Sequence, residues 1–293
     1  MTKVTYYSPN AVSPGSGATG MAVDLNADPI WLNTGSGLRG HSWRYTLGSA
    51  SVSGVGLDEA RECTATMDCV DLAQWDRARR VFDADLTALS RSDNARPGVI
   101  GVDGWECDAL VVSHEPDRIT PGWLQGKLTV LLLGKWRTWG ESDVTSFNPR
   151  NDTGEQWLDL PTDMAFDLTG MQRINIVHNP MMERMPFRMV VYGPVTNPGV
   201  QIGDNYYQVN VTVPEQGSLT IISITRQKSV ILRDRYGNET DVFDKAERGS
   251  GLDGGRYIFQ PIPPGDSRVE WSGDYGFDLT VVREDTEPPW STS

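Results

Sequence analysis

The spacing of apolar residues changes along the chain, and each change predicts a different element. Residues 62–70 alternate strictly between apolar and polar side chains, which is the period of a half-buried strand. Up to residue 89 the apolar side chains then recur every three or four positions, which predicts one amphipathic helix over residues 71–89 with Asp71 as its N-cap. The apolar face of the strand is formed by Cys63, Ala65, Met67 and Cys69. The face of the helix expected to meet solvent carries Asp76, Arg80, Asp83 and Asp85.

A long hairpin is predicted after the helix. Residues 104–115 and 122–133 have the character of two strands, joined by a loop over residues 116–121. The second strand ends in an apolar run, so we expect both of its faces to be covered there. Periodicity is lost over residues 134–154, where Gly, Asn and Pro cluster, and we place a domain boundary near residue 145.

The pattern is weakest at the start of the chain. Residues 1–40 contain Gly-rich turns and two short apolar runs, 21–25 and 30–32. We expect one or two short strands there, within a long arm. Residues 43–55 alternate loosely between apolar and small or polar side chains, which fits strand material.

The second half of the chain has the pattern of an all-β domain. Short apolar runs recur roughly every 8–13 residues with Gly, Pro, Asn or Asp between them, the spacing of a β-sandwich or jelly roll. We expect the tail, residues 284–293, to be exposed or to pair with another chain. The expected strands are residues 157–160, 174–178, 187–193, 200–202, 206–213, 219–225, 230–233, 256–259, 267–271 and 277–282.

Composition supports a folded chain of two domains. The sequence has 293 residues, of which 38% are hydrophobic and 22% are charged, so it can bury a core and is not a disordered chain. Together with the loss of periodicity, this length predicts a first domain over residues 1–145 and a second over residues 146–293.

The charge narrows the classes of partner. A formal net charge of −13 argues against a protein that binds nucleic acid through phosphate contacts, and against docking on an anionic membrane surface. No apolar stretch approaches the length of a membrane span, and the first residues lack the apolar core of a secretory signal. We therefore expect that the chain does not bind nucleic acid in a sequence-specific way and does not insert into a membrane. We also expect that it folds in a cytoplasm.

The residue types that carry catalysis or metal binding are scattered. His41, His114 and His178 lie far apart in the sequence, and the pair Cys63 and Cys69 has too long a spacing for a zinc knuckle. With Cys107 the cysteines number three, which in a cytoplasmic chain predicts free thiols. Phosphate-binding loops and nucleophile elbows do not occur. We expect no catalytic, cofactor-binding or metal-binding residues and no cofactor.

Two acidic segments and the tryptophans leave alternatives open. Asp24 with Asp28, and Asp234 with Asn238 and Asp241, offer oxygen ligands but lack the pattern of a calcium loop, so solvated turns are the preferred interpretation. The 39 carboxylates always provide pairs that could serve a glycosidase, and only proximity in space would select one. The ten tryptophans are expected to anchor cores or interfaces, and some could stack on sugars.

Several ordered motifs in the second half resemble one protein family. Gly193-Pro194 and Asn197-Pro198 each force a turn between strands. Gly217 precedes a further strand, Gly237-Asn238 follows the next, and Pro263-Pro264-Gly265 forms a rigid corner before the closing strands. This order resembles that of siphophage distal tail proteins of the Dit type. The first half resembles the family more loosely.

The resemblance implies a fold and a function. It implies a mainly β chain, with an N-terminal tail-tube-like β domain carrying one flanking α-helix and a C-terminal galectin-like β-sandwich. It further implies a structural protein and not an enzyme, which forms a homo-hexamer at the phage tail tip in the virion after assembly in the host bacterial cytoplasm. The expected partners are the major tail tube protein, the tail-associated hub or tip protein and the tape measure protein, with DNA passing through the central channel.

Two other functions stay open from the sequence. A carbohydrate-binding module would recognise a host surface glycan, and His178-Asn179-Pro180 faintly resembles a galectin sugar strand without its accompanying Arg and Trp-x-x-Glu. A glycosidase or other hydrolase on a β scaffold is the third interpretation.

Overall fold

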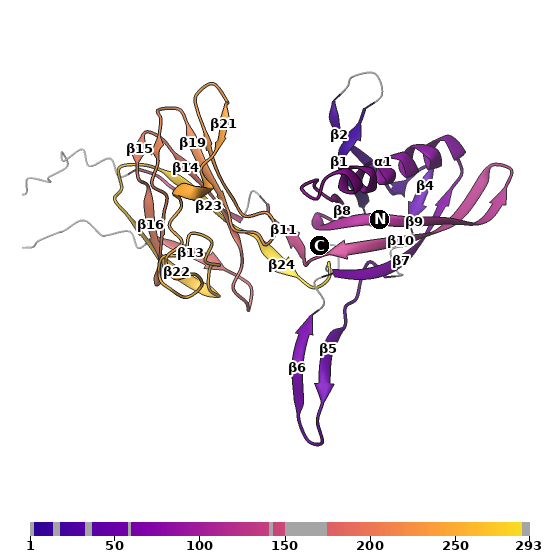
Figure 1. Cartoon of the computed structure of the whole chain (residues 1–293), viewed down its shortest axis with the longest axis horizontal. Coiled ribbons are helices and arrows are strands. Elements are labelled where there is room, and N and C mark those ends of the chain that lie inside the picture. Colours follow the sequence, from indigo (N-terminus) through magenta and orange to yellow (C-terminus); the bar gives the residue numbers. More distant parts are fainter. Residues whose placement is uncertain are drawn as a thin grey trace, which may run out of the picture. The chain divides into compact units, whose positions relative to one another are not determined.

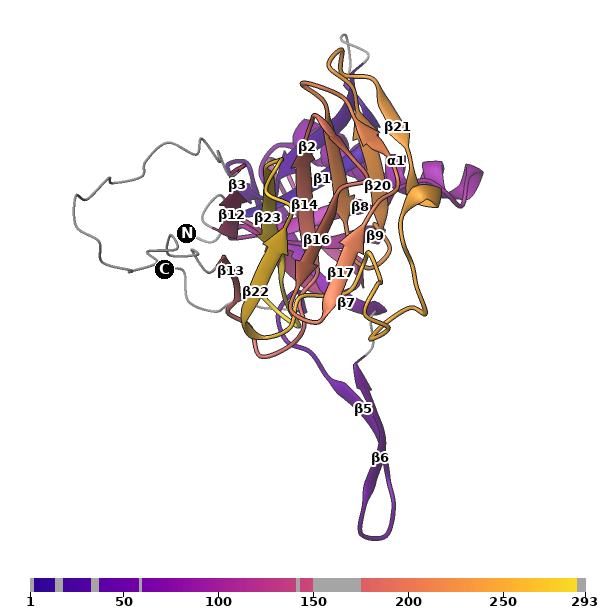
Figure 2. The same ribbon diagram turned by 90° about the vertical axis from the view of Figure 1, so that its left-hand side faces the viewer.

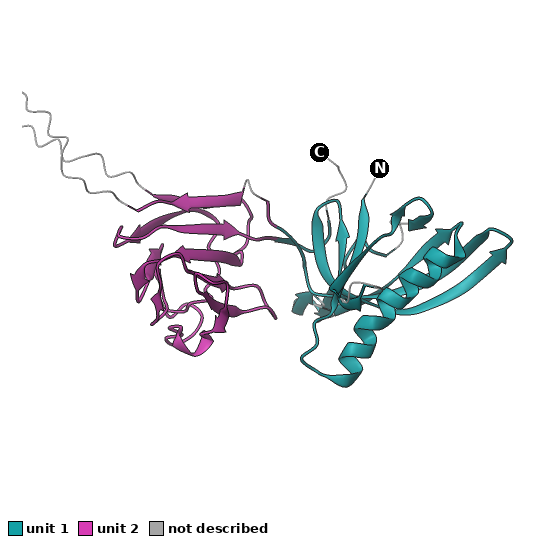
Figure 3. Cartoon of the chain, turned by 90° about the horizontal axis from the view of Figure 1, so that it is seen from above, with its two compact units in different colours: residues 1–138, 284–293 teal, residues 139–283 magenta. Residues whose placement is uncertain are grey.

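The computed structural model divides the chain into two compact units (Figure 3). The first unit comprises residues 1–138 and 284–293, and the second comprises residues 139–283. The fold is mainly β with a single α-helix among the described residues, as the sequence predicts. The described residues are 3–13, 18–32, 37–57, 60–140, 143–149 and 175–288.

A single large sheet organises the first unit (Figure 1). The strand order along its main path is β2-β1-β8-β9-β10-β7-β4-β3, and every strand pair is antiparallel. The core contains buried residues from nearly all of these strands and from the helix. The strands are β1 (Val4–Val12), β2 (Thr19–Asp24), β3 (Asn26–Ala27), β4 (Ile30–Leu32), β7 (Ala60–Cys69), β8 (Gly98–Val102), β9 (Trp105–Thr120) and β10 (Trp123–Leu133).

The helix α1 (Leu72–Arg91) confirms the change of period after residue 70. The Asp71 carboxylate caps it by accepting a hydrogen bond of 2.8 Å from the Ala73 N–H. Its buried side includes Trp75 and Phe82. A Cβ on Gly126 of β10 would collide with the Trp75 ring, so a glycine there lets the helix approach the sheet. The alternation predicted in β7 is confirmed, because its four apolar side chains are buried.

The expectation of a long arm at the start of the chain is wrong. β1 lies inside the large sheet between β2 and β8, and the side chains of Val4 and Tyr6 have no exposed surface. Polar residues such as Ser8 in the middle of β1 hide its alternation in the sequence. Ser8 is nevertheless fully buried, because its hydroxyl is hydrogen-bonded within the core.

The hairpin β9–β10 is longer than predicted. The expected loop over residues 116–121 is instead mostly strand, with Thr120 paired to Trp123 across a tight turn. Pro116, which cannot donate a ladder hydrogen bond, sits where the register shifts between Gln125 and Gly126. A bulge therefore accommodates the proline that suggested a loop.

The chain enters and leaves the second unit through a pair of short strands. β11 (Trp136–Thr138) pairs with β24 (Arg283–Asp285), so the last strand returns to the sheet of the first unit. The Glu287 carboxylate also accepts a 2.6 Å hydrogen bond from the Gly40 N–H. The expectation that the tail is exposed or pairs with another chain is wrong for these residues, and residues 289–293 lie outside the described part.

The second unit is a β-sandwich of two main sheets (Figure 2). One sheet has the order β12-β23-β14-β19-β20-β21 and the other the order β13-β22-β16-β17, and their inner faces share one core. A small third sheet pairs β15 with β18. The strands are β12 (Val144–Phe147), β13 (Ile176–Asn179), β14 (Phe187–Tyr192), β15 (Val195–Thr196), β16 (Gly199–Ile202), β17 (Asn205–Gln208), β18 (Thr212–Val213), β19 (Ser218–Ile222), β20 (Ser229–Arg233), β21 (Glu239–Asp241), β22 (Gly265–Trp271) and β23 (Phe277–Val281).

Most predicted strands of this unit are confirmed. The turns at Gly193-Pro194 and Asn197-Pro198 separate β14, β15 and β16 as expected, and β22 begins directly after Pro263-Pro264. The predicted strand at residues 206–213 is divided into β17 and β18. The predicted strand at residues 157–160 lies outside the described residues.

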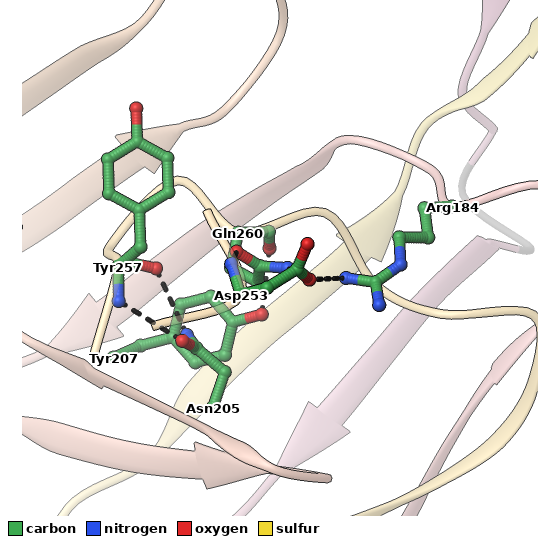
Figure 4. Close-up of polar contacts among 6 residues, drawn as sticks. All are labelled: Arg184, Asn205, Tyr207, Asp253, Tyr257 and Gln260. Carbon is green, nitrogen blue, oxygen red and sulfur yellow. Dashed lines mark hydrogen bonds and ion pairs between the residues drawn. The ribbon is translucent and has the colours of Figure 1, made fainter. Parts of the chain in front are cut away.

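The predicted strand at residues 256–259 is wrong, because this segment is an irregular loop. Polar side chains hold the loop in place of a ladder. Asn205 of β17 donates to the Tyr257 carbonyl at 3.0 Å and accepts from the Tyr257 N–H at 3.1 Å. The Tyr207 hydroxyl donates to the Gln260 carbonyl at 2.7 Å. Figure 4 shows this network through Arg184, Asn205, Tyr207, Asp253, Tyr257 and Gln260.

Candidate functional site

The three histidines lie on different elements. His41 precedes the exposed strand β5 (Trp43–Leu47), His114 lies in β9, and His178 lies in β13 of the other unit. The His178 Nδ1 atom is 2.6 Å from a carboxylate oxygen of Asp266 on an exposed surface. Among the described residues, no three His, Cys, Asp or Glu side chains gather in a way that could hold a metal ion.

The acidic segments form turns. The Asp24 carboxylate accepts from the Asn26 N–H at 3.0 Å. Asp234 accepts hydrogen bonds from the Tyr236 N–H and from both the backbone and the side chain of Asn238. The bond from the Asn238 side chain, with the backbone N–H groups, lowers the pKa of Asp234. These are solvated turns, as preferred from the sequence.

The three cysteines are free thiols within the core of the first unit. Burial raises the pKa of Cys63 to about 11 and that of Cys107 to about 12, and it also raises the pKa of Cys69. A thiol that stays protonated is a poor nucleophile and a poor metal ligand. The cysteines therefore act as small apolar side chains in the packing.

One predicted solvent-facing residue of the helix is buried. Asp85 has no exposed surface, and it accepts hydrogen bonds from the Tyr6 hydroxyl at 2.7 Å, the Ser8 hydroxyl at 2.5 Å and the Asn10 amide at 2.7 Å. Burial, with the neighbouring Asp85 carboxylate, raises the pKa of Tyr6. The prediction for Asp85 is wrong because polar partners on β1 satisfy the carboxylate. The cluster ties the helix to β1.

Exposed apolar side chains gather on one hairpin of the first unit. Among the described residues β5 and β6 (Val52–Leu57) pair as strands only with each other, and Figures 1 and 2 show the hairpin extending away from the body of the first unit. A two-stranded hairpin is marginally stable alone in water. The most exposed apolar side chains of the hairpin are Trp43 at 49%, Tyr45 at 59%, Leu47 at 69%, Val52 at 57% and Val55 at 60%.

A bulge brings these apolar side chains onto one face. Trp43, Tyr45 and Leu47 share a face of β5 by alternation. The pairing Arg44 to Gly56 and Thr46 to Ser53 gives β6 one extra residue within this stretch. Gly54 has a φ of +60° there, a backbone conformation that favours glycine. The extra residue places Val52 and Val55 on the same face as the three side chains of β5.

The resulting surface, which we call the hairpin face, consists of Trp43, Tyr45, Leu47, Val52 and Val55. Its polar opposite side carries Arg44, Thr46 and Ser53. Contiguous exposed apolar surface of this kind marks interaction sites in soluble proteins. The alternation over residues 43–55 was visible in the sequence, but its exposure was not.

No family model and no curated protein matches the sequence. A chain from the phage p2 baseplate in its activated conformation with Sr has a TM-score of 0.63 at 10% identity, covering 98% of this chain and 100% of that chain. The same baseplate with Ca gives 0.61 at 10% identity with the same coverage.

A third similar structure is that of a Dit protein. The SPP1 Dit protein, described as a paradigm of the hub adsorption apparatus in phages that infect Gram-positive bacteria, has a TM-score of 0.51 at 11% identity, covering 97% of this chain and 99% of that chain. The chain has the Dit fold. The likeness extends over both units, so the resemblance inferred from the motifs after Gly193 is confirmed at the level of the fold. The solved structures that share this fold come from a phage baseplate and a phage hub apparatus.

Proposed function

We propose that the chain is a non-enzymatic distal tail protein of a long-tailed phage, located at the tail tip of the virion. Six copies form a closed ring that joins the tail tube to the baseplate hub, and DNA passes through the central channel. The ring contacts the major tail tube protein, the tail-associated hub or tip protein and the end of the tape measure protein. It is built in the cytoplasm of the host bacterium.

The observation that carries this proposal is the likeness of the whole chain to a p2 baseplate chain and to SPP1 Dit. Coverage of both chains is nearly complete, so neither unit is left without a counterpart. A baseplate is an assembly of protein subunits, and a protein of this fold needs surfaces by which its copies meet.

The hairpin face supplies such a surface. Its apolar side chains are roughly half exposed or more and share one side of a hairpin that has no ladder partner among the described residues. We propose that it docks on a neighbouring copy of the same chain. In this proposal the hairpin meets a different surface of the neighbour, which makes the contact head to tail, and such contacts repeat around a ring until it closes.

The charge is consistent with a DNA channel. A chain with a net charge of −13 repels the phosphate backbone, so DNA can pass without adhering. A protein that bound DNA in transit would instead need basic surface.

Electron microscopy tests the proposal directly. The purified chain is imaged alone and after mixing with the major tail tube protein and the hub protein of the same phage. We expect rings with six-fold symmetry that attach to the end of the tube. A chain that stays single at high concentration and also fails to bind both partners would contradict the proposal.

A further inference from the structure

A groove runs along helix α1 where the helix faces the ends of β1 and β2. Two adjoining hollows of about 630 Å³ and 400 Å³ form it, and both are lined by Val12, Arg80 and Ala84. The lining residues of the helix recur at spacings of three and four positions, so both hollows follow one face of the helix. They include Ala73, Arg77, Arg80, Ala84, Ala88 and Arg91.

The floor of this groove is apolar and partly open to solvent. Val12 at the end of β1 is 56% exposed. Met21 of β2 and Ala84 of the helix are partly buried and pack against the core of the first unit, and Val81 is buried. The groove therefore offers an apolar surface of concave shape, which an apolar ridge of another protein can fill.

Unpaired arginines flank the apolar floor. Arg79, by contrast, lies between two carboxylates, 3.7 Å from Asp76 and 3.3 Å from Asp83. A guanidinium that is not bound to a carboxylate can stack on an aromatic ring, and arginine is enriched at protein interfaces. The arginines of the groove that are exposed and form no ion pair with any residue that the structure describes are Arg77, Arg80 and Arg91.

The hairpin face has the chemistry that this groove requires. Trp43 and Tyr45 provide aromatic rings on which a guanidinium can stack, and Leu47 provides exposed aliphatic surface. The lengths also agree. A five-residue strand such as β5 spans about 14 Å, and the helix spans roughly 16 Å between Ala73 and Ala84.

The groove and the hairpin lie on opposite sides of the first unit. In both Figure 1 and Figure 2, α1 and β2 lie at the top of this unit, and β5 and β6 extend from its bottom. The hairpin therefore points away from the groove of its own chain. A head-to-tail contact in a ring needs two such surfaces on each copy, one for each neighbour.

Another hollow of the first unit does not suit an apolar face. It measures about 310 Å³ and lies where β7, β9 and β10 run side by side. Covering its charged groups with apolar side chains would remove their water without giving them hydrogen-bond partners. The polar side chains that line it are Thr64, Thr66, Glu115, Asp117 and Lys127.

We propose that the groove along α1 receives the hairpin face of a neighbouring copy of the chain. Trp43 and Tyr45 pack against the guanidinium groups of the groove, and Leu47 packs on its apolar floor. This inference rests on the ring proposed above, and it names the second half of the contact between copies. Each copy gives its hairpin to one neighbour and its groove to the other, so the same contact repeats around the ring.

Cross-linking between copies tests the contact. Two forms of the full chain are mixed before assembly and treated with a short bismaleimide: Leu47→Cys on the hairpin, at a 69% exposed position, and Val12→Cys in the groove. The native thiols are buried and react slowly. We expect a covalent product of two chains from this mixture, and at most a tenth as much when Lys127→Cys in the other hollow replaces Val12→Cys.

Mass photometry of the same mixtures shows whether rings form, either alone or with the tube and hub proteins. Rings that give no product between positions 47 and 12, or an equal yield with Lys127→Cys, overturn this inference and leave the proposed ring standing. The same result follows if another tail protein occupies the groove. Chains that form no ring in any mixture contradict the proposed function, and the inference falls with it.

Substitutions in the groove test its chemistry. Val12→Asp places a carboxylate on the apolar floor, so we expect single chains, as for Leu47→Asp on the hairpin face. Arg80→Glu should weaken ring assembly about tenfold. Lys127→Glu reverses a charge in the other hollow and should have no effect. Circular dichroism confirms that each variant is folded. Six-fold particles in Val12→Asp, or equal effects of Arg80→Glu and Lys127→Glu, would overturn the assignment of the groove.

Discussion

Two antiparallel hairpins of the first unit, β9–β10 and β5–β6, show the same alternation of apolar and polar side chains, but the apolar face is buried in the first and exposed in the second. In β10 the side chains of Leu128, Val130 and Leu132 are at most 1% exposed, because the helix and neighbouring strands cover them. In the hairpin β5–β6 the corresponding apolar face is about half exposed or more. Alternation thus specifies a strand with an apolar face, but it does not specify what covers that face. In the covered hairpin the partner is the same chain, and in the bare one we propose that it is a second copy.

The largest expected effect separates the two hairpins by stability. Leu128→Asp places a carboxylate at a site that is 1% exposed, so we expect a loss of about 4 kcal/mol or more in the free energy of unfolding. Urea unfolding followed by circular dichroism measures it. A well-folded variant with near wild-type stability would show that β10 does not belong to the core.

A second prediction concerns the buried carboxylate of Asp85, which joins the helix to β1. Asp85→Ala removes the carboxylate that Tyr6, Ser8 and Asn10 share as an acceptor, so we expect a loss of about 3 kcal/mol in the free energy of unfolding. Asp83→Ala on the same helix is the matched control, because Asp83 is half exposed and, within the described part of the chain, pairs only with Arg79 on the surface. Equal unfolding free energies for the two variants would contradict a buried role for Asp85.

Alkaline pH tests burial in β9. Burial raises the pKa of Cys107 from 9.0 to about 12, so the folded state keeps the proton that the unfolded state loses. The contribution of Cys107 to stability is therefore complete below pH 9 and is lost as the pH rises toward 12. Comparing urea unfolding at several values above pH 9, we expect the slope of stability against pH to be less steep in Cys107→Ala. Identical slopes would indicate that the thiol is not buried.

The smallest effect on stability is expected from a substitution on the exposed hairpin β5–β6. Leu47 is 69% exposed, so Leu47→Asp should change the unfolding free energy of the single chain by no more than about 0.5 kcal/mol. Thermal unfolding at a concentration where the chain is monomeric provides the measurement. A loss comparable to that of Leu128→Asp would mean that the hairpin packs on its own unit.

Sequence reasoning succeeded where one rule dominated locally. The period of β7 and α1, the Asp71 cap and the Pro and Gly turns of the sandwich each follow from neighbours along the chain. It failed where the burial of a residue depends on partners that are distant in the sequence. A polar residue such as Ser8 is not expected in a buried strand, and a charged residue such as Asp85 is expected to face solvent. Both are buried because the Ser8 hydroxyl donates a hydrogen bond to the Asp85 carboxylate.

The functional surfaces were the least predictable part. The segment at residues 256–259 has a strand-like pattern, yet side chains from β17 hold it as a loop. The pairing of β16 with β22 joins segments that are far apart in the sequence, which no local pattern encodes. The hairpin face was visible only as loose alternation, because exposure depends on the rest of the fold.

Particle mass measured for three forms of the chain tests the central claim most directly. Mass photometry compares the wild type, Leu47→Asp on the hairpin face, and Ile119→Asp at the tip of the other hairpin, where the apolar side chain is 64% exposed. We predict particles of six times 32.4 kDa for the wild type and for Ile119→Asp, and single chains for Leu47→Asp. Six-fold particles that persist unchanged in Leu47→Asp would contradict the account.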